Sequence, residues 1–143
     1  MTLIEHQLDF GVEVHDRGGW TVVVARGELD AYTAPSLRAD LHKVITGGNT
    51  RVIVDLTQVP FVDASGLGVL VGALAKVRRA GGELRLVGQR RLSRLLEIAW
   101  LHHALPLFPS SDAAVADPDG PTTSAPDGDE PRVDRRVDRR SGR

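Results

Sequence analysis

Residues 62–72, VDASGLGVLVG, place one serine beside an aspartate and among three glycines. They follow the apolar run RVIVDL and lead into an apolar stretch with helical spacing. Glycines after a strand can hold the phosphates of a nucleotide, and a serine on a sharp turn can be a nucleophile. A serine at a helix N-terminus can also cap the helix and so have a structural role. The spacing around Ser65 separates these possibilities.

A dinucleotide-binding turn requires glycines directly after a strand and an acidic residue about 20 positions further on. Here nine residues, 57–65, separate Leu56 from Gly66, and the sequence reads LVGQ where the acidic residue would stand. A small nucleotide-binding module is therefore disfavoured, although direct binding of a nucleotide by the isolated protein would support it.

A serine nucleophile on a sharp turn would stand in a G-x-S-x-G pattern, but Asp63 and Leu67 occupy the two glycine positions. The five histidines are far from this loop in sequence, and none forms an H-x-x-x-H pair. We therefore expect a protein that is not an enzyme and has no catalytic residue, metal site or cofactor.

The simplest alternative gives the stretch a structural role, in which Ser65 caps a helix and Gly66 and Gly68 permit close packing. Two glycines in a first helical turn cost about 1 kcal/mol each relative to alanine. In addition, the apolar Phe61 and Val62 stand in a loop beside the serine. These features favour a surface that the backbone of a protein partner approaches closely.

Composition narrows the class of protein. A length of 143 residues fits one domain, and 41% hydrophobic with 26% charged residues is ordinary for a soluble protein. The chain has no cysteine, no signal-peptide pattern at its start and no apolar run near the roughly 18 residues of a membrane span. Its net charge is −1. We expect a cytoplasmic protein that binds neither membrane nor nucleic acid directly.

Hydrophobic periodicity predicts the elements that position Ser65. Apolar alternation and β-branched runs predict strands over 10–16, 20–27, 51–56, 83–88 and 104–108. Helical spacing predicts helices after residue 33 and over 65–80, 89–100 and 110–116. The order predicts an α/β fold with a mixed, mainly parallel sheet of four to five strands and about four helices.

Several details of these elements are also predicted. Thr33 is the expected cap of the first helix, and the strand over 51–56 is expected to be buried on both faces. In the helix over 65–80 the predicted buried stripe contains Leu67, Leu70 or Val71, Leu74 and Val77. In the helix over 89–100 it contains Leu92, Leu95 or Leu96, and Ala99.

The composition changes near the C-terminus. Residues 117–143 contain four prolines and no aromatic residue, so they offer too little apolar surface to offset the entropy cost of ordering. We therefore predict one domain over residues 1–116 and a disordered acidic and basic tail over 117–143. A solubilising role for this tail is favoured over a tether or a charged docking site.

The chain resembles the single-domain STAS family of bacterial anti-sigma factor antagonists from about Phe10 to Ala116. The strongest matches are GELD at 27–30 and DASGLG at 63–68. Supporting matches are VIVDLTQVPFVDASGLG and LSRLLEIAWLHHALPLF. The fold that this resemblance implies agrees with the predicted order of elements.

The resemblance implies a partner switch. An unphosphorylated antagonist binds an anti-sigma factor that is also a serine kinase, phosphorylation of the motif serine releases it, and a serine phosphatase resets it. The motif serine corresponds to Ser65, and Ala64 replaces a second hydroxyl that some relatives carry. Catalysis and ATP binding belong to the partner. The alternative is a STAS scaffold that is never phosphorylated.

The residues expected to bind the partner surround Ser65 and the end of the second strand. They are Asp30, Tyr32, Asp63, Ala64, Gly66, Leu67 and Gly68. Asp63 could orient the serine hydroxyl or accept hydrogen bonds at the helix start. Asp30 could contact the partner or form an Asx-turn, in which its side chain accepts a backbone hydrogen bond two residues on.

Overall fold

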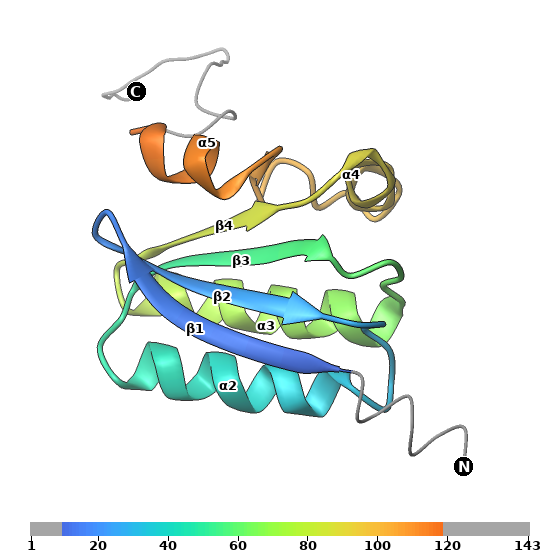
Figure 1. Ribbon diagram of the computed structural model, residues 1–143, viewed down its shortest axis with the longest axis horizontal. Helices are drawn as coiled ribbons and strands as arrows, with labels where there is room; N and C mark the ends of the chain where they lie inside the picture. Colours follow the sequence, from blue (N-terminus) through green and yellow to red (C-terminus); the bar gives the residue numbers. More distant parts are fainter. Residues whose placement is uncertain (1–9, 119–143) are drawn as a thin grey trace.

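The computed structural model describes residues 10–118, which form a five-stranded sheet in the order β1-β2-β3-β4-β5 and four helices (Figure 1). The strands are β1 (Gly11–Arg17), β2 (Trp20–Arg26), β3 (Arg51–Gln58), β4 (Glu83–Val87) and β5 (Leu107–Phe108). The helices are α2 (Ala34–Thr46), α3 (Ala64–Arg79), α4 (Arg90–Ile98) and α5 (Ser111–Ala116). Most of the predicted tail, residues 119–143, lies outside the described residues, as do residues 1–9 of the predicted domain.

The sheet is mixed, as predicted. β1 and β2 form an antiparallel hairpin, whereas β2–β3, β3–β4 and β4–β5 pair in parallel. Gly18 and Gly19 connect the hairpin with φ angles of +58° and +84°. Positive φ at both positions of a two-residue turn matches the twist of the flanking strands, and glycine adopts it without steric cost.

Helices α2 and α3 cover one face of the sheet, and α5 covers the other (Figure 1). Alternation along β2 separates these layers, because Val23 belongs to the larger core under α2 and α3, whereas Trp20 and Val22 face the smaller cluster under α5. The predicted burial of β3 on both faces is confirmed, since Val52 and Ile53 are both fully buried on opposite sides.

Some element boundaries differ from the predictions. β3 continues to Gln58, and the last strand is only two residues long, because β5 pairs with β4 at two positions alone. Helix α3 begins one residue early, at Ala64, and α4 ends at Ile98 rather than at residue 100.

The predicted buried stripes are confirmed in part. In α3, Leu70, Leu74 and Val77 are buried as predicted. Val69 and Ala73 are also buried, whereas Val71 is exposed and Leu67 is only partly buried. Ala99 was predicted to point inward, but it lies after the end of α4 and is exposed.

One fully buried cation, Arg85, joins β4 to α5. Its Nε donates to Glu83 Oε2 at 2.8 Å, and its Nη1 donates to the main-chain carbonyls of Ala114 and Asp117. The guanidinium lies 4.4 Å from the centre of the Trp20 ring. These carbonyls lie in the last turn of α5 and just beyond it, so Arg85 satisfies acceptors that the helix leaves open.

Replacing Arg85 with methionine tests this role. The Arg85→Met side chain keeps an apolar stem but donates nothing, and an unpaired buried carbonyl costs about 1–3 kcal/mol. We expect hydrogen exchange to accelerate in residues 111–117 much more than in β2 and β3. Arg51→Met is the matched control, because Arg51 also stacks on Trp20 at 4.4 Å but has no hydrogen bond to α5. Unchanged protection of α5 in Arg85→Met would contradict the assignment.

Candidate functional site

The loops that follow β2 and β3 lie side by side at one edge of the sheet. Leu29 N–H donates to the carbonyl of Phe61 at 2.8 Å, and Asp63 N–H donates to the carbonyl of Leu29 at 3.1 Å. Leu29 and Val62 thereby form a short parallel bridge beyond the ends of the strands. This bridge brings the GELD segment next to the segment that opens α3.

Asp63 caps helix α3. Its Oδ1 accepts hydrogen bonds from the backbone N–H groups of Ser65, at 2.8 Å, and Gly66, at 3.2 Å. A carboxylate suits this place because the N–H groups and the dipole of a helix N-terminus favour negative charge. The interpretation of Ser65 as the cap was wrong, and the capping alternative for Asp63 is the one that the structure shows.

Ser65 is the second residue of α3 and is partly exposed. Its backbone N–H is bound by Asp63, whereas its hydroxyl makes no hydrogen bond with any residue in 10–118. Ala64 and Gly68, one position before it and three after it, are both exposed. The hydroxyl therefore stands at a helix start with small side chains around it.

Gly66 and Gly68 have different surroundings. A Cβ on Gly66 would lie 2.7 Å from Leu29 Cγ and 2.9 Å from Val62 Cγ1, so this glycine permits α3 to pack on the bridge. A Cβ on Gly68 would meet no heavy atom within 4 Å. The sequence interpretation that both glycines make room for a partner is therefore wrong for Gly66. Gly68 leaves open space on the outer surface of the helix.

Asp30 forms an Asx-turn. Its Oδ1 accepts from the N–H groups of Tyr32 at 3.0 Å and Thr33 at 3.1 Å. Thr33 stands at the N-cap position of α2 but makes no side-chain cap, contrary to prediction. Its hydroxyl instead donates to the carbonyl of Glu28 at 2.7 Å. The side chains of Asp30 and Thr33 thus hold the loop between β2 and α2 in place.

Exposed aromatic residues stand on both loops. Tyr32 is 55% exposed and Phe61 is 50% exposed. Phe61 was not among the predicted partner-binding residues, although the apolar Phe61 and Val62 in a loop beside the serine were a signal for it. Leu67 is partly buried against the main core and so contributes less surface than expected.

The described residues hold no group of three or more histidine, aspartate or glutamate side chains that could bind a metal ion. Between residues 10 and 118, no helix has both the length and the apolar character to cross a membrane.

Comparison with known proteins agrees with this architecture. The STAS domain family model matches residues 11–114. An anti-sigma-B factor antagonist of Listeria monocytogenes is 36% identical over 96 residues, which are 66% of this chain and 84% of the relative. The crystal structure of an anti-sigma factor antagonist from Mycobacterium paratuberculosis has 28% identity and a TM-score of 0.68, covering 76% of this chain and 95% of that one.

A third similarity concerns the fold alone. The Bacillus cell fate determinant SpoIIAA, solved in its phosphorylated form, has 21% identity and a TM-score of 0.59 over 74% of this chain and 96% of its own. The STAS domain match covers the mixed sheet, the bridge between the two loops and helix α3 with its cap Asp63. The chain belongs to the STAS domain family, and the relatives described above are anti-sigma factor antagonists.

The two glycines give a matched pair of variants. Gly66→Ala should lower the free energy of unfolding, because overpacking costs about 1–3 kcal/mol and the better helix propensity of alanine returns at most about 1 kcal/mol. Gly68→Ala should raise it by up to about 1 kcal/mol, since its surroundings are open. Urea denaturation measures both, and equal effects of the two changes would contradict the described packing.

The cap gives a second test of the site. Asp63→Ala removes the acceptor for two N–H groups and should cost about 0.5–2 kcal/mol of stability. Asp63→Asn keeps an acceptor oxygen and should cost much less. Thermal unfolding followed by circular dichroism measures both variants. A loss in Asp63→Asn as large as that in Asp63→Ala would show that capping is not the main role of this side chain.

Proposed function

We propose that this chain is an anti-sigma factor antagonist controlled by phosphorylation of Ser65. When Ser65 is unmodified, the chain binds an anti-sigma factor that has serine kinase activity, and the sigma factor is released. Phosphorylation of Ser65 by that kinase ends the complex, and a serine phosphatase restores the binding form. The chain itself supplies the acceptor hydroxyl and the docking surface, while catalysis and ATP belong to the partner.

The observation that carries this proposal is the state of the Ser65 side chain. It is partly exposed at a helix start, and its hydroxyl has no hydrogen bond with the described residues. By contrast, the hydroxyls of Thr33 and Ser111 are held by Glu28 and Asp55. A kinase can therefore reach the Ser65 hydroxyl without breaking such a bond, and the exposed Ala64 and Gly68 add no steric hindrance.

The relatives support the same role. Their names describe anti-sigma factor antagonists, and the neighbour SpoIIAA has been solved in a phosphorylated form. The similarity spans most of the length of each of these proteins. It includes the segment over 11–114, within which Asp30, Asp63 and Ser65 lie.

The capping bonds explain why a phosphate would oppose binding. A phosphoryl group adds about −1.5 to −2 charges. The N–H groups of Ser65 and Gly66, which could neutralise it, are already bonded to the carboxylate of Asp63. The new charge would therefore face the partner beside an existing carboxylate. An unpaired charge buried in an interface costs about 2–5 kcal/mol, which corresponds to roughly 30- to several-thousand-fold in affinity.

A phosphate on Ser65 would have little effect on the stability of the fold. The Ser65 side chain is not part of the core, and its open neighbours let a phosphate extend into water in the free protein. Phosphorylation would therefore change binding far more than it changes stability. This separation is what a reversible switch between partners requires.

Binding to the cognate anti-sigma factor tests the proposal. Ser65→Ala should bind it at least as tightly as the wild type and resist release by ATP. Ser65→Glu should bind at least about 30-fold more weakly while its melting temperature changes by only a few degrees. Isothermal titration calorimetry and intact mass after incubation with kinase and ATP measure these effects.

Ser36 supplies the matched control, because it is an exposed serine in the first turn of the neighbouring helix α2. Ser36→Ala should leave phosphorylation and release unchanged. Phosphate on Ser36 or Ser93 with Ser65 unmodified would contradict the proposal. Stable assembly with other proteins and no phosphotransfer would instead favour the scaffold role.

A further inference from the structure

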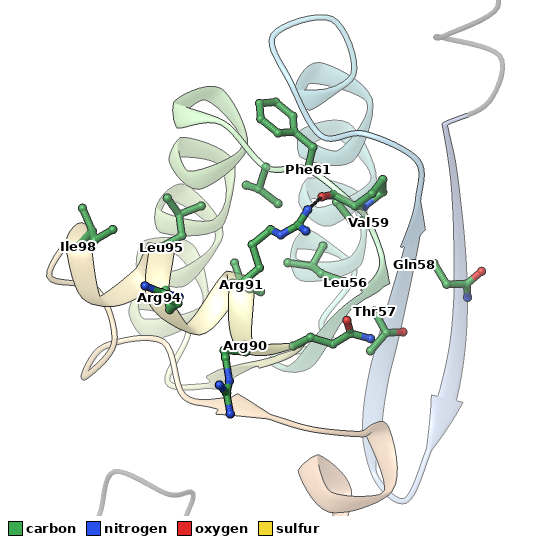
Figure 2. Close-up of a pocket in the computed structure, with 14 residues that line it drawn as sticks. Leu56, Thr57, Gln58, Val59, Phe61, Arg90, Arg91, Arg94, Leu95 and Ile98 are labelled. Atoms are coloured by element: carbon green, nitrogen blue, oxygen red, sulfur yellow. Dashed lines mark hydrogen bonds between the residues drawn. The ribbon is translucent and has the colours of Figure 1, made fainter.

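A groove of about 1060 Å³ lies between α4 and the loop that joins β3 to α3 (Figure 2). One wall is formed by the end of β3 and the loop after it, residues 56–62. The other wall is formed by Gln89 and by six residues of α4, Arg90, Arg91, Leu92, Arg94, Leu95 and Ile98. Figure 2 shows Arg91 crossing from α4 toward the loop, with Phe61 on the loop side and Ile98 near the far end of α4. The groove was not predicted from the sequence, which gave no sign that this loop faces α4.

The rim of the groove is basic. Arg90, Arg91 and Arg94 line it, and no aspartate or glutamate does, although the whole chain has a net charge of −1. Arg91 Nη1 donates to the carbonyl of Pro60 at 2.9 Å, which links α4 to the loop. Arg90 and Arg94 form no hydrogen bond or ion pair with any residue in 10–118. Two guanidinium groups thus have no anionic partner within the described part of the chain.

The floor and ends of the groove are apolar. Leu56 and Leu92 are buried beneath it, Phe61 is 50% exposed, and Ile98 is 76% exposed. An apolar surface rimmed by charged side chains is typical of a protein-binding groove. A ligand complementary to the apolar floor and the basic rim would therefore have both apolar side chains and carboxylates.

The geometry limits the form of that occupant. β3 lies between β2 and β4 in the sheet, so the groove offers no free strand edge for an added strand. Its helix wall, α4, has nine residues and is therefore about 14 Å long. A wall of this length fits two to three turns of a helix laid beside it, with apolar residues inward and acidic residues toward the arginines.

We propose that this groove binds an amphipathic acidic helix of a protein partner. The wall on the β3 side ends at Val62, and the lining does not include Asp63. The groove also shares none of its lining with Ser65, and occupation of it requires no phosphorylation. It is thus a second docking surface, independent of the switch proposed above.

A designed peptide tests this surface on the full chain. The probe is a fluorescein-labelled helix of about 14 residues with leucines along one face and glutamates flanking them. We expect saturable binding by fluorescence anisotropy that weakens as salt rises, because the contacts with the arginines are screened. Amide chemical shifts should change in residues 57–62 and 89–98.

Variants separate the groove from general charge effects. Arg90→Glu with Arg94→Glu should weaken peptide binding at least tenfold, and an acidic residue in the first turn of α4 does not oppose helix formation. Ile98→Ser should weaken it without changing any charge. The matched control, Arg38→Glu with Arg79→Glu, reverses two exposed arginines on α2 and α3 and should bind like the wild type. Ser65→Glu should also bind like the wild type, which separates this result from the phosphorylation switch.

Several outcomes would overturn the proposal. They are absence of saturable binding, shifts centred on the start of α3, equal loss in the control variant, or equal binding of a peptide with lysines in place of the glutamates. Displacement of the peptide by GTP or ATP would assign the groove to a nucleotide instead. Concentration-dependent dimerisation that buries the same residues would assign it to a second copy of the chain.

Discussion

The close contact of Gly66 with Leu29 and Val62 determines where the first turn of α3 lies. Only a residue without a Cβ allows the helix backbone to rest on the bridge between the two loops. This contact therefore fixes Asp63 at the cap position and Ser65 at the second position of the helix. The same bridge holds the loop over 59–62, which together with the end of β3 forms one wall of the groove beside α4. Both surfaces therefore depend on one point of backbone packing.

The carboxylates near this point are used locally. Asp63 binds the first N–H groups of α3, Asp30 closes the loop before α2, and Asp55 accepts from the backbone and hydroxyl of Thr57 at 2.9 and 2.7 Å. Asp63 and Asp30 lie in the loops after β3 and β2, whereas Asp55 lies within β3, and each accepts hydrogen bonds from residues two or three positions further along the chain. The result is a rigid edge on which less constrained side chains, such as Ser65 and Phe61, are displayed.

Sequence patterns were sufficient where one physical effect dominated. Apolar runs were enough to predict β2, β3 and β4, and helical spacing predicted α3 to within one residue at each end. Sequence patterns failed where two neighbouring residues are both suited to the same role. An aspartate and a serine two positions apart are both good caps, and only the bridge to Leu29 decides for Asp63. Likewise, the role of Gly66 depends on Leu29, which comes from a distant segment of the chain. The groove between α4 and the loop over 59–62 also joins segments that are distant in sequence.

The attachment of α5 by Arg85 has a practical consequence. Because the guanidinium holds the carbonyls of Ala114 and Asp117, the described chain ends on the face of the sheet opposite α2 and α3 (Figure 1). Anything joined beyond residue 118 starts from that face, whereas Ser65 stands at the start of α3. A fluorophore, affinity handle or surface tether is therefore better fused at the C-terminal end than beside β1, whose N-terminal end is close to the loops that carry the site (Figure 1).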